Sequence, residues 1–307
     1  MMQGRRKMRI KKYSKLELVN LRNGVLFALP FFIGFICFTM YPVISSLYYS
    51  FCKYTIVSTP HWIGLKNYIK LFTEDELFGI SLYNSLYYAI FTIPLTIAAA
   101  IISALLLNIP IKGQPIFRTI FYLPSITPVV ASSILWVWIL NPQYGILNAF
   151  LEKLGINGPG WLADPKWSKP ALILMSLWGI GGGIIIFLAA LQDVPQELYE
   201  SAELDGANWW NKLWAITIPS ISPAILFTLI MGMIGTLQFF APIYVMTNGG
   251  PVNSTTMYAF YLYRNAFVYL DMGYASSMAW ILFVIVLLGT ILMFKSSSKW
   301  VYYRGER

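Results

Sequence analysis

The sequence predicts an all-α integral membrane protein with six transmembrane helices. Only 11% of its 307 residues are charged, 57% are hydrophobic and the mean hydropathy is +0.62. A soluble domain typically carries about 25% charged residues. The apolar residues also gather into long runs, and a helix that crosses a bilayer needs roughly 20 of them. Together these observations exclude an ordinary soluble domain.

Six apolar runs are long enough to form spans. The first is too long for a removable signal peptide and lacks its small-residue cleavage site. Pro30 and Pro42 lie within it and are expected to kink the helix, which membrane helices tolerate. We expect the spans over residues 24–51, 83–107, 117–140, 171–191, 220–246 and 274–294.

Lysine and arginine are unevenly distributed between the two sets of connections. Cytoplasmic loops carry the excess of basic residues, so both termini are expected in the cytosol. Of the 22 basic residues, 15 then lie inside, in segments 1–23, 108–119, 192–219 and 295–307. The other 7 lie outside, in segments 52–82, 141–170 and 247–273.

The distribution of basic residues also indicates the boundaries of the membrane domain and its contact with lipid. Eight basic residues lie in segment 1–23, directly before an apolar run. The formal charge of +9 therefore indicates contact with the lipid bilayer rather than with nucleic acid. We expect a basic cytosolic tail (1–23), a six-helix membrane domain (24–294) and a cytosolic C-terminal tail (295–307).

The spans and motifs exclude several functions. No expected span has an ionisable residue in its interior, and Arg118 lies at an edge. Ionisable groups inside membranes mark proton relays and ion-coupled pumps, so a proton-coupled transporter is disfavoured and an uncharged solute is favoured. The sequence has no GxxxxGK[ST], HExxH or GxSxG motif. We therefore expect no catalytic residue, metal site or bound cofactor in this chain.

The cytosolic segment 192–219 is unusual because it carries five acidic residues and one lysine. Asp193 is expected to cap a short helix, with Pro195 near its first position. Gly206 is expected to end that helix, because glycine accepts a left-handed conformation. A second short helix follows, with Trp209, Trp210 and Trp214. Two short helices with acidic and apolar faces suggest a surface that docks in another protein's groove.

The stretch from Glu200 to Ala207 (ESAELDGA), followed by Ile216-Thr217-Ile218-Pro219, resembles the EAA loop of permease subunits of bacterial ATP-binding-cassette (ABC) importers. Serine replaces the usual alanine at Ser201, and isoleucine replaces the usual leucine at Ile218. In that family the loop is a coupling helix that sits in a cleft of the ATP-hydrolysing subunit. The resemblance implies that coupling involves Glu200, Ser201, Ala202, Asp205, Gly206 and Ala207, with Glu200 and Gly206 the key positions.

Other motifs are similar to those of sugar permeases related to the larger membrane subunit of the maltose transporter. They are Trp178-Gly179 with Gly181 to Gly183, Leu123-Pro124, Gly145 to Asn148, and Thr247-Asn248-Gly249-Gly250-Pro251. The similarity covers about residues 24–295. It implies a type I ABC importer permease fold in the bacterial cytoplasmic membrane. It also implies a second, paralogous permease, two ATP-binding subunits that hold ATP and magnesium, and an extracytoplasmic sugar-binding protein.

Sugars are bound by aromatic faces together with hydroxyl and amide groups. Gly232, Thr236 and Phe239 are spaced to share one face of the fifth span, which also contains Gln238. Trp178 and Gly182 are spaced to share a face of the fourth span. In the maltose family these two spans line the central site. The substrate path is thus predicted at Trp178, Gly182, Gly232, Thr236, Gln238 and Phe239.

Two alternatives to a sugar permease remain open. The chain could serve an importer of another neutral solute, or it could act as a stand-alone carrier or channel. A stand-alone protein would transport its solute without an ATP-hydrolysing partner. Packing between helices is the alternative role of each path residue, with Gly179 and Gly183 as a small-residue contact.

The topology can be tested with a cysteine introduced at Asn157, in a chain whose Cys37 and Cys52 are replaced by serine. Segment 141–170 is expected outside, so a membrane-impermeant thiol reagent should label Asn157→Cys in intact cells. Labelling that requires cell lysis would contradict the six-span arrangement.

Overall fold

The structure, a computed structural model, describes residues 14–303 and is mostly helical. Residues 1–13, which hold six of the eight basic residues of the expected N-terminal tail, lie outside the described residues. Arg304 and Arg307 of the expected C-terminal tail also lie outside them.

The first helix begins earlier than expected, inside the predicted tail. Ser14 and Glu17 form a capping box, in which the Glu17 amide donates to Ser14 Oγ (3.2 Å) and the Ser14 amide donates to Glu17 Oε2 (2.7 Å). From there the chain is continuously helical to Ser50, through α1 (Lys15–Phe35), a π-helical turn (Ile36–Met40) and α2 (Tyr41–Ser50).

The chain stays helical at both prolines where kinks are expected. Pro30 lies inside α1, and the π-helical turn comes directly before Pro42. A proline ring crowds the carbonyl four residues earlier and supplies no N–H. A wider π-helical turn at that place relieves the crowding, so the helix continues through Pro42.

A small hairpin follows α2. Strands β1 (Cys52–Lys53) and β2 (His61–Trp62) pair antiparallel, and the short helix α3 (Lys66–Thr73) comes next. The Asn67 amide on α3 donates to the carbonyls of Ser50 and Cys52, both at 3.0 Å. The side chain of one buried asparagine thus joins the end of the first helix to the hairpin.

The second long helix, α4 (Glu76–Asn108), includes the whole of the expected span 83–107. Asp75 caps it by accepting a hydrogen bond from the Phe78 amide at 3.1 Å. The Asp75 carboxylate also accepts hydrogen bonds from the hydroxyls of Tyr261 and Tyr274. These bonds fix the start of α4 to two elements near the other end of the sequence.

The third and fourth expected spans are each broken into two helices. The chain turns by 98° between α5 (Gln114–Ile126) and α6 (Val129–Ile139), because the residue before Pro128 takes an extended conformation. It turns by 49° between α8 (Ser168–Trp178) and α9 (Gly181–Gln192), where Gly179 ends α8. The expectation of one continuous helix in each place is wrong. The short helix α7 (Ile146–Lys153) lies between these pairs.

The segment after α9 contains α10 (Gln196–Leu204), α11 (Trp209–Lys212), a π-helical turn (Leu213–Thr217) and α12 (Ile218–Ser220). The expected cap at Asp193 is wrong. Asp193 ends α9 instead, because that helix continues to Gln192, and Pro195 occupies the cap position of α10. The fifth expected span corresponds to α13 (Ser222–Leu237) and α14 (Ala241–Met246).

The last part of the chain holds α15 (Tyr258–Tyr263), a π-helical turn (Arg264–Val268) and α16 (Met272–Ser297). Gly273 at the start of α16 lies directly against β1, where a β-carbon would be 2.1 Å from the Cys52 carbonyl oxygen. Only glycine allows this approach. Its amide donates to the Tyr54 carbonyl at 3.0 Å.

The buried core follows α4 along its length. At one end Phe78 packs with Tyr258 and Met278, and at the other Ala104 packs with Phe187 and Ile221. Between them Tyr88, Leu172, Ile243 and Phe260 form a third cluster. Helix α4 therefore organises the packing of α8, α9, α13 and α15.

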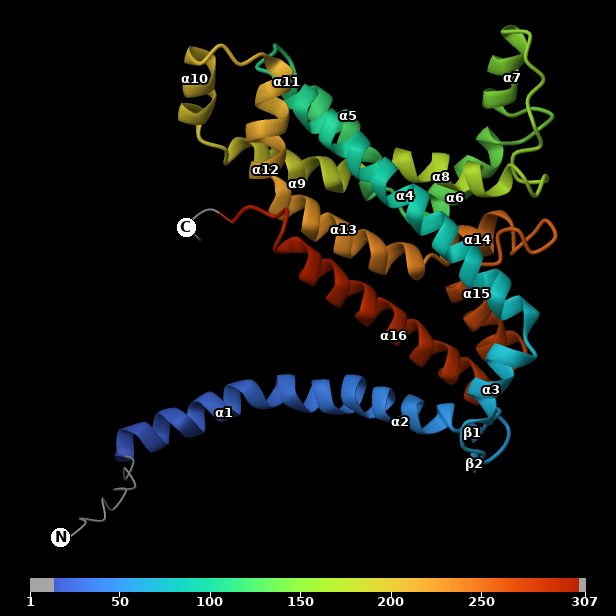
Figure 1. Cartoon of the computed structure of the whole chain (residues 1–307). Helices are drawn as coiled ribbons and strands as arrows, with labels where there is room; N and C mark the ends of the chain where they lie inside the picture. The colour runs from blue at the N-terminus through green and yellow to red at the C-terminus, as the bar shows by residue number, and fades with distance from the viewer. Residues whose placement is uncertain (1–13, 304–307) are drawn as a thin grey trace.

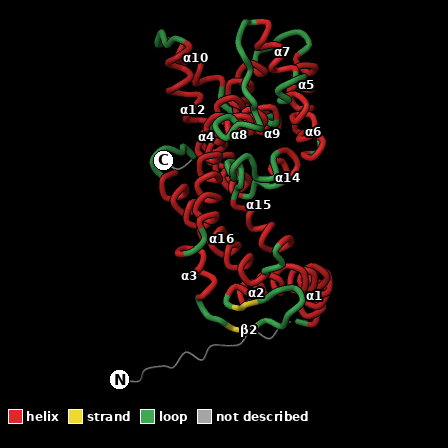
Figure 2. The backbone as a smooth tube through the Cα atoms, turned by 90° about the vertical axis from the view of Figure 1, so that its right-hand side faces the viewer, coloured by secondary structure: helices red, strands yellow, loops and turns green. Residues whose placement is uncertain are grey.

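Connections that are far apart in sequence gather at two ends of the molecule. The start of α1, helices α10 and α11 and the C-terminal end of α16 lie at one end, on the left of Figure 1. The hairpin, α3, α14 and α15 lie at the other end. Helix α1 stands away from α4, α8 and α9 in both views (Figures 1 and 2). We call the first end the loop end.

Four helices in the described range are long and apolar enough to cross a membrane, or up to six if each bent pair forms one span. The single-helix candidates are residues 15–50, 76–108, 222–246 and 272–297. The structure therefore supports a helical protein that crosses the membrane several times.

Two neighbouring glycines allow a test of how α9 packs on α5. A β-carbon at Gly181 would lie 2.7 Å from the Phe121 carbonyl oxygen, whereas one at Gly182 would meet nothing within 4 Å. Gly181→Ala should therefore destabilise the protein by about 1–3 kcal/mol, the usual cost of overpacking. Gly182→Ala is the matched control and should leave the melting temperature in detergent unchanged. Equal melting temperatures for both variants would contradict this contact.

Candidate functional site

The turn between α10 and α11 is a regular helix end that requires glycine. Gly206 has φ of +75°, a left-handed conformation that a side chain disfavours. The Gly206 amide donates to the Glu203 carbonyl (3.0 Å) and the Ala207 amide donates to the Ala202 carbonyl (2.8 Å). These two bonds form a Schellman motif. A β-carbon at Gly206 would meet nothing within 4 Å, so the requirement for glycine comes from the backbone alone.

Two side-chain contacts hold this segment together. Lys212 on α11 forms an ion pair with Glu203 on α10 at 2.8 Å. The hydroxyls of Tyr199 and Thr217 lie 2.9 Å apart and join α10 to the π-helical turn before α12. The segment from α10 to α12 therefore forms one folded unit instead of a loose connector.

The unit presents a mixed acidic and apolar surface. The side chains of Glu200, Ser201 and Asp205 are exposed, whereas Ala202 and Ala207 are half-buried. Leu204 is 91% exposed, and Trp209, Trp210 and Trp214 are all more than half exposed. All six residues predicted for coupling therefore lie around one helix end, next to large apolar groups that this chain does not cover.

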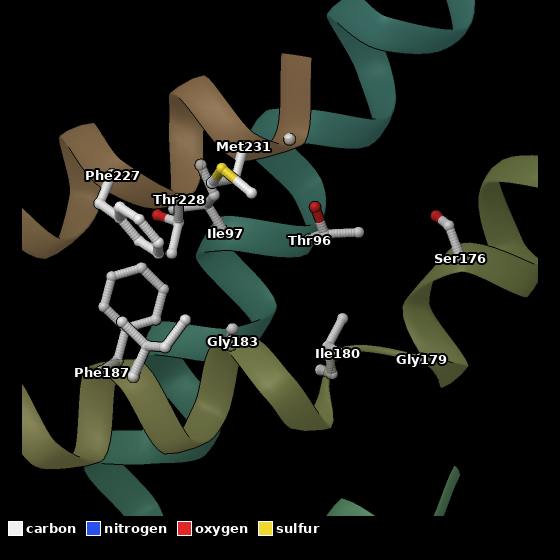
Figure 3. Close-up of a pocket in the computed structure, with 13 residues that line it drawn as sticks. Thr96, Ile97, Ser176, Gly179, Ile180, Gly183, Phe187, Phe227, Thr228 and Met231 are labelled. Carbon is white, nitrogen blue, oxygen red and sulfur yellow. The ribbon is translucent and has the colours of Figure 1, made fainter. Parts of the chain in front are cut away.

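Four helices, α4, α8, α9 and α13, line a cavity of about 350 Å³. Thr96 and Ile97 contribute from α4, and Phe227, Thr228 and Met231 contribute from α13. Phe187 of α9 and Phe227 of α13 face each other at one end, and Ser176 and Gly179 lie at the other (Figure 3). The full lining is Thr96, Ile97, Ala100, Ser176, Gly179, Ile180, Gly183, Ile186, Phe187, Phe227, Thr228, Met231 and Gly232.

The cavity wall is apolar apart from three hydroxyl groups and exposed backbone. Thr96 donates to the Thr92 carbonyl (2.8 Å), Ser176 to the Ile173 carbonyl (2.6 Å) and Thr228 to the Ala224 carbonyl (2.9 Å). Each proton is thus used within its own helix, and each oxygen keeps a lone pair that can accept a hydrogen bond. The lining contains no ionisable side chain.

The structure brings only one of the predicted path residues into this cavity. Gly232 lines it, and Thr236 lies one turn further along α13. Trp178, at the end of α8, is 37% exposed and packs edge-on against Trp136, with ring centroids 6.4 Å apart. Gly182 is exposed on α9.

Two expectations about shared helix faces are wrong. Helix α13 ends at Leu237, so Gln238 and Phe239 lie beyond it, and Phe239 does not continue the face of Gly232 and Thr236. Phe239 instead stacks on buried Tyr88 of α4, with ring centroids 4.5 Å apart. Trp178 and Gly182 belong to different helices because of the break at Gly179.

Sequence patterns did not indicate the cavity residues Thr96, Ser176, Phe187, Phe227 and Thr228. They lie on four helices, α4, α8, α9 and α13. Threonine and serine in an apolar helix commonly bond to their own backbone, so their presence alone gave no signal. Glycines at spacings of four, as at Gly179 and Gly183, were recognised but were interpreted as packing contacts.

A lysine in α8 lies outside the cavity. Lys169 donates to Asn84 Oδ1 at 3.0 Å and lies 4.9 Å from the ring centroid of Tyr83 and 4.8 Å from that of Tyr87. Asn84 in turn donates to the carbonyls of Asn253 (2.9 Å) and Thr256 (3.0 Å). This network holds the loop after α14 against α4, at the end opposite the loop end.

The last described residues pack beside the segment from α10 to α12. The Tyr302 amide donates to Ser222 Oγ at 2.8 Å. Tyr302 and Tyr303 line a groove of about 410 Å³ together with Pro195, Leu198 and Pro223. Tyr302 and Tyr303 thus lie against the junction between α10 and α13, which sequence patterns did not indicate.

Comparisons with known proteins agree over most of the chain. Residues 77–299 match the family described as the inner membrane component of binding-protein-dependent transport systems. A probable ABC transporter permease protein of Bacillus subtilis (strain 168), YesP, is 42% identical over 92% of this chain and 93% of its own. The lactose transport system permease protein LacF of Rhizobium radiobacter is 35% identical over 90% of this chain and 94% of its own.

A solved structure has the same fold. In the crystal structure of a bacterial alginate ABC transporter, in complex with a periplasmic protein that holds an alginate pentasaccharide, one chain superposes with a TM-score of 0.81. It is 26% identical in sequence, and the match covers 92% of this chain and 97% of that one. The arrangement of bent and straight helices is thus shared with an importer subunit.

Proposed function

The chain belongs to the family of inner membrane components of binding-protein-dependent transport systems, and from this we propose how it moves its solute. It is a membrane permease subunit of an ABC importer for sugars or oligosaccharides, and a transport subunit without ATPase activity of its own. It is a multi-pass protein of the cytoplasmic membrane.

We infer the membrane orientation from the loop end together with the basic residues of the sequence. The start of α1, the segment from α10 to α12 (the coupling segment) and the end of α16 share the loop end (Figure 1). Segments 1–23, 192–219 and 295–307 of the sequence hold 13 of its 22 basic residues. Basic residues favour the cytosolic face. We place the loop end in the cytosol and count each bent pair as one span, which gives six spans.

The segment from α10 to α12 is the coupling (EAA) element in this proposal. Its exposed tryptophans and Leu204 would enter a groove of an ATP-binding subunit, and Glu200 and Asp205 would face basic groups at the groove's edge. Two such subunits would serve the two permeases of the complex. ATP and magnesium would be held by those subunits and not by this chain.

The cavity between α4, α8, α9 and α13 forms part of the solute path in this proposal. The observation that carries this proposal is its lining, which combines two phenyl rings, three hydroxyl oxygens and no ionisable group. Phenyl rings stack on sugar faces, and hydroxyl oxygens accept from sugar hydroxyls. We extend the path from Gly232 to the neighbouring Thr236, Gln238 and Phe239, and across the break in the fourth span to Trp178 and Gly182.

Two further partners complete the transporter. A single permease has open faces along α1, which is exposed over its whole length, and we propose a second, paralogous permease beside it. A sugar-binding protein would deliver solute to the end opposite the coupling segment. The neighbouring alginate structure contains such a periplasmic protein, with its pentasaccharide bound.

Substitution of Gly206 tests the coupling role. Gly206→Val would strain the left-handed turn by about 1–2 kcal/mol, and a β-carbon at this position would meet nothing within 4 Å. Uptake by the complete transporter should fall at least tenfold, and substrate-stimulated ATP hydrolysis should be lost. Gly206→Asn is the matched control, because asparagine tolerates this conformation, and it should keep most of the activity. Normal substrate-stimulated ATPase activity in the valine variant would disprove the assignment.

Removal of path side chains tests the solute route. Phe239→Ala and Thr236→Ala should each lower uptake roughly three- to tenfold, because a lost hydrogen bond or aromatic contact costs about 1 kcal/mol. Basal ATPase activity should persist, since neither residue lies in the coupling segment. Phe294→Ala, an exposed aromatic position near the end of α16, is the control and should transport normally. Unchanged rates and sugar selectivity in both path variants would place the route on other helix faces.

A further inference from the structure

Helices α5 and α9 touch at Gly181 and diverge toward the loop end, which leaves a wedge-shaped cavity of about 330 Å³. One wall is apolar and consists of Leu107 of α4 with Ile184, Ile185 and Leu188 of α9. The other wall belongs to α5 and carries Arg118, Thr119 and Tyr122. We call this cavity the α5–α9 wedge. It is separate from the cavity of the proposed solute path.

Arg118 is a half-buried cation without a counter-charge among residues 14–303. Its Nε atom is buried and has no hydrogen-bond partner. Within residues 14–303, the ion pair that the structure shows is Glu203–Lys212. The sequence has no aspartate or glutamate between Glu76 and Glu152, so α5 and its flanking segments supply no carboxylate.

An unpaired guanidinium in an apolar wedge is costly to bury, and an ionisable group within a membrane helix marks a functional site. Arg118 lies four residues after Gln114, the first residue of α5. At 1.5 Å per residue it is about 6 Å along the helix. This is close to the boundary between lipid headgroups and acyl chains if the loop end faces the cytosol, as proposed above.

We propose that the α5–α9 wedge binds an anionic phospholipid of the cytoplasmic leaflet. The Arg118 guanidinium would hold the phosphate through paired N–H donors, and the Tyr122 hydroxyl can donate to the same group. An acyl chain would lie along Ile185 and Leu188. Basic pockets between membrane helices on the cytoplasmic side are suited to such headgroups. The apolar wall favours a lipid over a free phosphate ion.

The position of the wedge allows a bound lipid to affect the coupling segment. Helix α9 forms its apolar wall and leads directly, at Gln192, into the coupling segment. On the other face of α9, Gly183 and Phe187 line the solute-path cavity. A lipid that fills the wedge would therefore fix the spacing of α5 and α9, and should raise coupled ATP hydrolysis.

The test uses the complete transporter in nanodiscs of phosphatidylcholine, with or without phosphatidylglycerol. Phosphatidylglycerol retained after extraction is counted by native mass spectrometry. Arg118→Gln should retain roughly fivefold less than wild type, the factor that corresponds to about 1 kcal/mol per basic residue. Lys112→Gln is the matched control, because Lys112 is exposed in the preceding loop outside the wedge, and it should retain as much as wild type.

Ile185→Trp is a second variant that fills the wedge while keeping Arg118, and it should also reduce retention. If the transporter with Arg118→Gln does not assemble, lipid retention in Ile185→Trp tests the proposal instead. Wild-type retention in both assembled variants would overturn the proposal. Displacement of phosphatidylglycerol by inorganic phosphate alone would also overturn it. The same holds if the wild-type complex retains no phosphatidylglycerol because a helix of the second permease fills the wedge.

Sugar-stimulated ATP hydrolysis is measured on the same complexes, because the inference rests on the proposed orientation and function. We expect phosphatidylglycerol to raise the rate of ATP hydrolysis by the wild-type complex. We expect no such rise in the Arg118→Gln complex. A wild-type complex without sugar-stimulated hydrolysis would refute the proposed function. Normal stimulation with no Arg118-dependent lipid binding would refute the lipid site alone.

Discussion

The interior of a bilayer offers no hydrogen-bond partner to a peptide group, and the rest of this structure depends on that constraint. The spans are helical because a helix satisfies its own backbone. The hydroxyls of Thr96, Ser176 and Thr228 follow the same rule, since each donates to a carbonyl of the preceding turn. A wall built in this way is stable when the cavity holds no solute. It can still accept hydrogen bonds from a solute that passes.

The breaks in the helices mark where the constraint is relaxed. Irregular backbone at membrane depth is tolerated where it is buried in protein or lines a cavity. The α8–α9 break satisfies this condition, because Gly179 and Ile180 line the cavity between α4, α8, α9 and α13. Gly181 then brings α9 against α5 more closely than any side chain would allow. A short glycine-rich stretch thus ends one helix, exposes backbone to the proposed path and fixes the next helix.

Hydropathy located the helical segments because burial in lipid requires a long apolar run. The helix end at Gly206 was predicted because a left-handed residue at a helix end favours glycine. The breaks at Gly179 and Pro128 were missed because hydropathy is continuous across them. The part of α1 before residue 24 was not predicted, because the capping box at Ser14 lies within a basic stretch. The cavity could not be predicted, because Thr96, Phe187 and Thr228 meet only through the packing of α4, α9 and α13. Arg118 was noticed at a span edge, but its lack of a partner depends on the fold.

The geometry around α9 and α13 explains how one turn could govern a distant cavity. Phe187 lies five residues before the end of α9, and Thr228 lies six residues after the start of α13. At 1.5 Å per residue, each is only about 8–9 Å along its helix from the junction with the coupling segment. Short stretches of α9 and α13 therefore connect that segment to opposite walls of the cavity. The segment must move as one body for this connection to work. An ion pair as exposed as Glu203–Lys212 contributes less than about 1 kcal/mol, so the Tyr199–Thr217 bond and the Schellman turn at Gly206 must supply most of the rigidity.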